Sequence, residues 1–226
     1  MRVSRRLGAA LATVGLVVAL AACSSDTKKA SDDMSGMDMS HGMTTGLGNV
    51  SGSGTYSGFG LTPPQPRPNF VLTDEAGASF SFGTQTQGKP TLLFFGYTNC
   101  PDDCPTTMAD IHLALKEVPA AVRAKTLVVF VTTDPKRDSG PVIKKWLSQY
   151  TAGVPAANWI GLRGTRAQIN AAQAAAHVTI AADDGQTHSL SVLLYGPDDY
   201  AHVSFALTNT ERQQMVHDLP IVAAGT

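Results

Sequence analysis

The sequence predicts an α/β fold built as one folded domain with additional residues at its N-terminus. Three patterns support this prediction. Short apolar runs typical of buried strands alternate with helical patterns, a two-strand pattern precedes them, and a second two-strand pattern with a helix follows them. At 226 residues the chain is long enough for one sizeable core and its tails, but not for two. Its 21 glycines and 13 prolines indicate that part of it is loop or linker.

Residues 1–22 have the features of an export signal. Three arginines precede an apolar stretch that is too short and too rich in alanine to be a stable membrane span. The stretch ends in Leu-Ala-Ala-Cys, which resembles the cleavage site of bacterial lipoproteins. This resemblance implies that Cys23 becomes the lipidated first residue of the mature chain, at the extracytoplasmic face of the cell membrane. The alternative is an ordinary signal peptide followed by an incidental cysteine.

Residues 23–65 are predicted to be a disordered tether. They include few large apolar side chains and many Ser, Gly, Asp, Thr and Met residues, so they cannot bury enough surface to offset the entropy of ordering. Within them, residues 33–43 hold four of the seven methionines together with His41. Thioether and imidazole ligands suit Cu(I), so a weak copper-collecting site is one interpretation. A flexible polar segment in which methionine is incidental is the other.

The folded domain is assigned to residues 66–221 and opens with a β-hairpin. Apolar and polar residues alternate at 69–73 and 79–82, on either side of a turn at 74–77. A continuous apolar run with aromatic residues at 92–95 then predicts a buried strand.

A helix is expected over residues 105–118. Pro105 suits the first turn of a helix, where its missing N–H costs nothing. Apolar residues then recur at helical intervals, at Met108, Ile111, Leu115 and Val118.

The second half of the domain alternates strands and helices before a final hairpin. Apolar runs predict strands, Ser139 with Pro141 and Thr165 provide helix-start signals, and Thr208 or Asn209 can cap the last helix. The expected elements are strand 127–131, helix 139–150, strand 159–162, helix 165–177, strands 189–195 and 200–206 around a turn at 196–199, and a helix ending near residue 219. This order is that of a thioredoxin-like α/β sandwich, here with an N-terminal β-hairpin extension.

Two cysteines, Cys100 and Cys104, follow the strand at 92–95 with three residues between them. Both lie at the start of the helix, where the helix dipole favours thiolate over thiol. Positions four residues apart on a helix are separated by about 6 Å along its axis, within the Cα separation of about 4.4–6.8 Å that a disulfide tolerates. The pair can therefore close as a disulfide or stay open and hold one ion. A purely structural pair is the alternative.

The run Phe-Gly-Tyr-Thr-Asn-Cys-Pro-Asp-Asp-Cys-Pro-Thr at 95–106 resembles the signature of the Sco/SenC family of thioredoxin-like copper proteins, and it matches at every fixed position. In that family a histidine, usually preceded by aspartate, completes the metal site with the two cysteines. The matching residue is His188, which follows a turn at 182–185. Here Thr187 replaces the acidic neighbour, which concerns the hydrogen-bond support of the ligand more than the ligand itself. Without the resemblance, His188 would be read as a polar loop residue.

Other polar residues are assigned lesser roles. Asp134 matches the family's Asp-Pro segment and is expected either to orient the site loop or to cap its own loop. Asp102 and Asp103 are expected to be solvated, where their charge opposes thiolate formation and attracts cations. The remaining histidines of the domain are expected to have structural or solvent roles: His112, His177, His202 and His217.

The resemblance implies a monomeric, membrane-anchored copper chaperone. It would bind copper, as Cu(I) or Cu(II), through Cys100, Cys104 and His188 and pass it to the Cu-A site of cytochrome c oxidase subunit II. The alternative is a dedicated thiol–disulfide oxidoreductase that reduces the acceptor's cysteines; peroxide sensing through a sulfenic acid ranks behind both. A formal net charge of −1 without a basic stripe argues against nucleic-acid binding.

Overall fold

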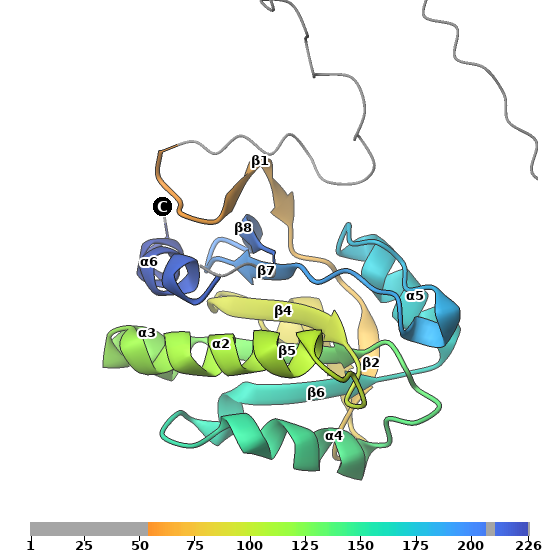
Figure 1. Ribbon diagram of the computed structural model, residues 1–226. Helices are drawn as coiled ribbons and strands as arrows, with labels where there is room; N and C mark the ends of the chain where they lie inside the picture. Colours follow the sequence, from red (N-terminus) through yellow and green to blue (C-terminus); the bar gives the residue numbers. More distant parts are fainter. Residues whose placement is uncertain (1–53, 207–210, 226) are drawn as a thin grey trace, which may run out of the picture. The chain divides into compact units, whose positions relative to one another are not determined.

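One mixed β-sheet organises residues 54–206 and 211–225, the part of the chain that this computed structural model describes (Figure 1). The eight strands lie in the order β1-β8-β7-β4-β5-β6-β2-β3. The strands are β1 (Phe59–Pro66), β2 (Val71–Asp74), β3 (Ser79–Ser81), β4 (Thr91–Gly96), β5 (Leu127–Thr132), β6 (Trp159–Arg163), β7 (Val192–Tyr195) and β8 (Tyr200–Phe205). The helices are α1 (Phe82–Gln85), α2 (Asp103–Glu117), α3 (Ala120–Lys125), α4 (Gly140–Leu147), α5 (Arg166–Ala175) and α6 (Glu211–Ala223). The export signal, Cys23 and the methionine-rich stretch at 33–43 lie outside the described residues.

The centre of the sheet is parallel, and this decides where loops converge. Strands β4, β5 and β6 run parallel, with Phe94 opposite Phe130, and Gly96 opposite Thr132 at their carboxyl ends. On the other side of β4, strand β7 runs antiparallel, with Val192 opposite Phe94. The loops that follow β4 and β5 and the loop that precedes β7 therefore meet at one end of the strands, the carboxyl edge of the parallel part of the sheet.

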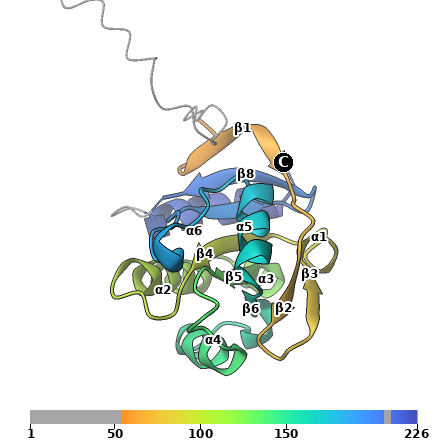
Figure 2. The same cartoon turned by 90° about the vertical axis from the view of Figure 1, so that its right-hand side faces the viewer.

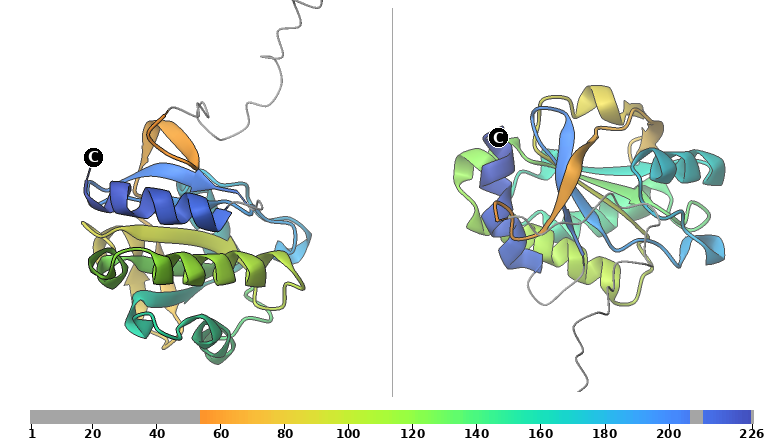
Figure 3. Two further views of the ribbon diagram at one scale, coloured as in Figure 1. Left: turned by 60° about the vertical axis from the view of Figure 1, so that its left-hand side comes forward. Right: turned by 90° about the horizontal axis from the view of Figure 1, so that it is seen from above.

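Helices cover both faces of this sheet. Side chains of a strand alternate between its faces, so Leu92 and Phe94 pack under α2, α4 and α6, whereas Leu93 and Phe95 pack with α1 and α5. Figures 2 and 3 show α5 on the face of the sheet opposite to α2 and α4, and α6 lying alongside α2. Within the described residues, no helix combines the length and apolarity needed to cross a membrane.

Both predicted hairpins are present. Strands β2 and β3 pair with Leu72 opposite Phe80, and β2 extends the sheet beyond β6. The turn between them is built by Asp74, whose carboxylate accepts from the backbone of Ala76 and Ala78, and by Gly77 with φ of +94°. Strands β7 and β8 form the second hairpin around residues 196–199.

The predicted end of the tether at residue 65 is wrong. Strand β1 pairs antiparallel with β8 and adds an edge strand to the sheet, with Leu61 buried. Upstream of it, the backbone N–H groups of Ser57 and Gly58 each donate to the buried carboxylate of Asp218 at 2.8 Å. The strand was missed because two consecutive prolines interrupt its pattern. Prolines cannot donate to a ladder, but an edge strand with an irregular register tolerates them.

Two helical features also differ from the prediction. Helix α3 was not predicted; it is short and has no fully buried residue, so it has no apolar periodicity to detect. Helix α6 continues past Leu219 and Pro220 to Ala223, because Val222 is still buried against the core. Its predicted cap at Thr208 or Asn209 lies outside the described residues. By contrast, Thr165 forms the expected cap of α5, as a reciprocal capping box with Gln168.

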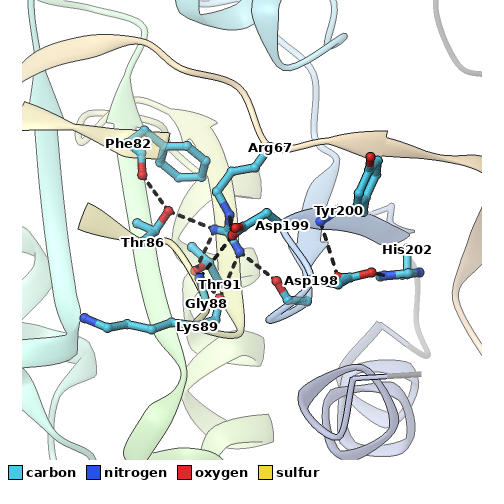
Figure 4. A network of polar contacts seen from close by, with 11 residues as sticks. Arg67, Phe82, Thr86, Gly88, Lys89, Thr91, Asp198, Asp199, Tyr200 and His202 are labelled. Atoms are coloured by element: carbon cyan, nitrogen blue, oxygen red, sulfur yellow. Dashed lines mark hydrogen bonds and ion pairs between the residues drawn. The ribbon is translucent and has the colours of Figure 1, made fainter. Parts of the chain in front are cut away.

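A buried arginine closes the end of the sheet at which β4 begins (Figure 4). The side chain of Arg67 is only 2% exposed and lies 5.0 Å from the centre of the Tyr195 ring. It donates five hydrogen bonds of 2.8–3.1 Å, to Asp199 Oδ1, Thr86 Oγ1, Thr91 Oγ1 and the carbonyls of Lys89 and Gly196. One side chain thereby ties the segment after β1 to α1, β4 and the β7–β8 turn.

Candidate metal centre

The two cysteines and His188 reach the same edge of the sheet from different parts of the chain. Cys100 lies in the loop after β4, and Cys104 lies in the first turn of α2. His188 is 84 residues beyond Cys104, in the loop before β7. Because β7 lies beside β4 and runs in the opposite direction, the residues that precede it pass the loop that follows β4.

His188 contacts Cys104 directly. Its Nε2 lies 3.4 Å from Cys104 Sγ, and its Nδ1 lies 2.8 Å from the carbonyl oxygen of Ser189. A carbonyl can only accept, so Nδ1 carries the hydrogen and the Nε2 lone pair faces the sulfur. Burial lowers the pKa of His188, partly offset by the hydrogen bond to Ser189 and by the charge of Asp103. The imidazole is therefore held neutral, which is the form that binds a metal.

Aromatic rings confine this imidazole. The Tyr97 ring meets it edge to face, with centroids 5.6 Å apart, and Phe94 does so at 6.1 Å. Both residues belong to β4 or its loop, so the strand that leads to the cysteines also packs against the histidine.

The two thiols have opposite electrostatic environments. For half-buried Cys100, burial alone would raise the pKa, but hydrogen bonds from the backbone of Cys104 and Asp102 and from the Cys104 and Tyr97 side chains lower it overall. The Cys104 backbone N–H lies 3.4 Å from Cys100 Sγ. Cys104 is fully buried, and burial, opposed only in part by a hydrogen bond from the Tyr97 backbone, raises its pKa. Cys100 is thus the thiol that ionises first.

The site opens to solvent through a cavity of about 300 Å³. Its lining residues come from residues 97–103, called the cysteine loop below, and from residues 186–190 around the histidine: Tyr97, Cys100, Pro101, Asp102, Asp103, Gln186, Thr187, His188 and Leu190. A ligand or a partner's side chain can therefore reach Cys100 without unfolding of the domain.

The three predicted ligands are linked as two pairs that share Cys104. Cys100 adjoins Cys104, and Cys104 adjoins His188. In the part of the chain that the structure describes, no group of three or more His, Cys, Asp or Glu side chains is close enough to enclose a metal ion. Binding by all three would therefore require a movement of side chains, and half-buried Cys100 is the one with room to move.

Asp138, not Asp134, holds the cysteine loop. The buried carboxylate of Asp138 accepts from the backbone and hydroxyl of Thr98, at 2.9 and 2.6 Å, and from the hydroxyl of Thr132 at 2.6 Å. Asp134 is buried and pairs instead with Arg137. No local pattern in the sequence marks Asp138, because Thr98 and Thr132 come together only where β4 and β5 end side by side.

The other described histidines lie away from the cysteines. His177 is exposed, and His112 is partly buried on α2. His202 lies 2.8 Å from a carboxylate oxygen of Asp198, and His217 lies 2.6 Å from one of Asp218. These positions agree with the structural and solvent roles expected of them.

Comparison with known proteins identifies relatives by sequence and by fold. The model of the SCO1/SenC family matches residues 61–223. A putative copper-binding protein of Stutzerimonas stutzeri is 34% identical over 137 residues, which are 58% of this chain and 64% of that protein. A SCO2-like protein of Rickettsia felis is 35% identical over 101 residues, 45% of this chain and 46% of that protein. The matches thus span less than two thirds of each of these relatives.

Solved structures show the same architecture. Yeast Sco1 superposes with a TM-score of 0.61 at 25% identity, covering 72% of this chain and all of that one. Bradyrhizobium japonicum ScoI, solved with copper bound, has a TM-score of 0.56 at 29% identity, covering 70% of this chain and 99% of that one. These likenesses confirm the predicted thioredoxin-like α/β fold and show that proteins similar to this chain bind copper. Since the family model covers well over half of its residues, the chain belongs to the SCO1/SenC family.

Proposed function

We propose that the protein is a copper chaperone that carries copper on Cys100, Cys104 and His188. The contact that carries the proposal is the 3.4 Å approach of His188 Nε2, with its lone pair, to Cys104 Sγ. Thiolates suit Cu(I), and an added imidazole suits Cu(II). Copper is the cargo in this scheme, so a site that can both take it up and release it is required.

The unequal thiols provide an order of binding. Cys100, with the lowered pKa and the open side, offers a thiolate first. Cys104 then loses its proton, because a metal ligand must be deprotonated and metal binding releases protons. His188 completes the set without a proton change, since its Nδ1–H stays on the Ser189 carbonyl.

We infer that the acceptor is the Cu-A site of cytochrome c oxidase subunit II. BsSco, a protein of similar fold, is described as a member of the Sco family of cytochrome c oxidase assembly proteins. The cavity beside Cys100 leaves one side of the site open, so thiolates of an acceptor can replace the carrier's ligands one at a time. Lipidation at Cys23 would keep the domain at the extracytoplasmic face of the membrane; this part rests on the sequence of residues 1–23.

Copper binding by the reduced full-length protein tests the proposal. We expect one copper per chain, with affinity weakened in His188→Ala by at least the roughly 10- to 100-fold that is typical when a residue supporting a metal ligand is removed. His202→Ala is the matched control, because that imidazole is also largely buried and hydrogen-bonded but lies on β8. Affinity unchanged by His188→Ala would contradict the chaperone proposal.

The second candidate, a dedicated thiol–disulfide oxidoreductase, is favoured by the contrast between the thiols. The Cys100 thiolate would attack an acceptor disulfide and release one acceptor thiolate. Cys104, after losing its proton, would attack Cys100 Sγ, release the second acceptor thiolate and leave a Cys100–Cys104 disulfide. Two electrons pass to the acceptor. Cys104→Ser should then accumulate the mixed disulfide, whereas Cys100→Ser should not form it.

A further inference from the structure

The histidine loop, residues 182–188, has a backbone that its own residues do not readily adopt. Asp183, Asp184 and Gly185 have φ values of 48°, 56° and 96°. Residues with a side chain rarely occupy this left-handed region, and doing so costs free energy. Between 182 and 187 only Gly185 is buried, so apolar packing does not support the loop. Hydrogen bonds within the loop and contacts from outside it must therefore stabilise this conformation.

Arg166, the first residue of α5, makes such contacts. Its Nη1 donates to the carbonyl of Thr133, and its Nη2 donates to the carbonyl of Asp184 at 2.6 Å. One planar guanidinium thus joins the loop after β5 to the histidine loop, which the single ammonium of a lysine cannot do with the same geometry. Lys136 also pairs with the Asp184 carboxylate, but both groups are about 70% exposed, so this pair contributes little.

Thr133 makes the second contact and connects both halves of the site. Its hydroxyl donates to the carbonyl of Gly185 at 2.6 Å, and its backbone N–H donates to the carbonyl of Gly96 at 2.6 Å. Gly96 ends β4 and packs against Cys104, because a Cβ there would lie 2.8 Å from Cys104 Sγ. Thr133 therefore lies between the strand end that leads to the cysteines and the loop that carries the histidine.

The histidine loop and the loop after β5 are in direct contact at Gly185, where there is no room for a side chain. A Cβ at Gly185 would lie 1.8 Å from the Thr133 carbonyl oxygen. Within the histidine loop, the Thr187 hydroxyl donates to Asp183 at 2.8 Å, so the residue before His188 is used inside the turn. The imidazole's place next to Cys104 thus depends on how the whole loop is held.

We propose that Arg166 and Thr133 are positioning residues for His188. They clamp the histidine loop to the end of β5 and so set the approach of the imidazole to Cys104. This inference rests on the proposed copper function, because it assigns to these residues an effect on copper that passes through His188.

Arg166→Ala in the reduced full-length protein tests the clamp. We expect Cu(II) affinity to fall about tenfold or more, as for other residues that support a metal ligand, and the imidazole nitrogen coupling in the EPR spectrum to weaken. Arg166→Lys should recover only part of the affinity. Without copper, the amides of Ala182 and Gly185, which donate within the turn, should exchange faster with solvent in the variant.

A double-mutant cycle separates positioning from general loss of structure. Combined with His188→Ala, Arg166→Ala should cause no further loss of affinity. Arg123→Ala is the matched control, because Arg123 also donates to two backbone carbonyls, those of Leu115 and Lys116, at the far end of α2. It should leave affinity unchanged.

Two results would overturn the clamp. Equal losses from Arg166→Ala in the wild-type and His188→Ala backgrounds would mean that Arg166 does not act through the imidazole. Full affinity in Arg166→Ala, with weakened binding in His188→Ala, would reject the clamp but leave the copper function standing. Unchanged copper affinity in the single variant His188→Ala would reject the copper function. The amide exchange of Arg166→Ala would still report whether Arg166 holds the loop.

Discussion

At the scale of single residues, the two sulfurs near the start of α2 differ in exposure and in hydrogen bonding. Cys100 faces the cavity and receives hydrogen bonds from the backbone of the helix's first turn, whereas Cys104 is buried beneath that turn against Gly96. Hydrogen bonds to a thiolate lower its pKa, and burial raises it. The pair therefore combines a thiol that ionises easily, Cys100, with one that loses its proton only when it binds a metal or forms a disulfide, Cys104.

Alkylation rates should reveal this difference. Because its pKa is lowered, Cys100 should stay reactive toward iodoacetamide at pH values at which an ordinary cysteine is protonated, and Cys104 should react far more slowly at every pH. Rates measured from pH 5 to 9 in Cys104→Ser and Cys100→Ser, each with Cys23→Ser to remove the third thiol, compare the two. Identical pH profiles would show that the helix start does not discriminate between them.

At the scale of elements, the contact between α2 and α6 includes a buried acid. Glu211, the first residue of α6, is fully buried, and neither carboxylate oxygen has a hydrogen-bond partner among the described residues. Burial, with the nearby charge of Asp110 on α2, raises the pKa of Glu211 from 4.5 to about 7. The helix pair therefore packs best when this carboxyl is protonated, and it carries a free-energy cost when the carboxyl ionises.

The free energy of unfolding should consequently fall as pH rises. Between 4.5 and about 7 the folded state binds a proton that the unfolded chain has released, so stability is lost through this window and the loss is complete above it. By linkage the loss is on the order of 3 kcal/mol. Urea denaturation at pH 5 and pH 8 measures it, and Glu211→Gln should largely abolish the difference.

Two controls identify the group responsible. Asp110→Asn should reduce the pH dependence without removing it, because burial is the larger cause of the shift. Burial raises the pKa of Asp110 as well, and the charge of Arg212 offsets part of that rise, so Arg212→Ala should slightly strengthen the dependence. A pH dependence that persists undiminished in Glu211→Gln would assign it to another group.

At the scale of the whole molecule, the two ends of the parallel strands have separate tasks. The carboxyl ends of β4 and β5 support the cysteine loop and the histidine loop. The opposite end is closed by the buried guanidinium of Arg67, whose five donor groups are all used. A substitution at the Arg67 end can therefore change the stability of the fold without touching the residues of the proposed copper site.

Arg67→Ala should test this separation. The substitution removes all five hydrogen bonds of the guanidinium, including those to Asp199 and to the carbonyls of Lys89 and Gly196. Asp199 is 33% exposed and still accepts from the backbone of Gly88, so the expected loss is at least the roughly 1.5–3 kcal/mol of one hydrogen bond to a charged group. Thermal unfolding should report a markedly lower Tm, while copper affinity, measured well below that Tm, should match the wild type. Reduced affinity in a still-folded Arg67→Ala protein would show that the two ends are coupled.

Much of the fold was predictable because neighbouring residues decide it. The strand at 92–95, the helix after Pro105 and the capping box at Thr165 follow from apolar spacing and capping chemistry. Strand β1 escaped prediction because its prolines are acceptable only at the edge that β8 offers. Helix α3 is six residues long and has only partly buried Val122 against the core, which is too little for a helical period to be recognised.

The sequence by itself determined the fold class and placed Cys100 and Cys104 where β4 gives way to α2, Cys100 in the loop and Cys104 in the first turn of the helix. Patterns within a few residues are enough for both. Only the tertiary structure decided which residues support them. The approach of His188 to Cys104, the anchoring of the cysteine loop by Asp138 and the bridge from Arg166 to Thr133 all join distant segments. The physical reason is strand pairing: β7 lies antiparallel to β4, and β5 lies parallel to it, so their ends meet at one edge whatever their separation in the chain.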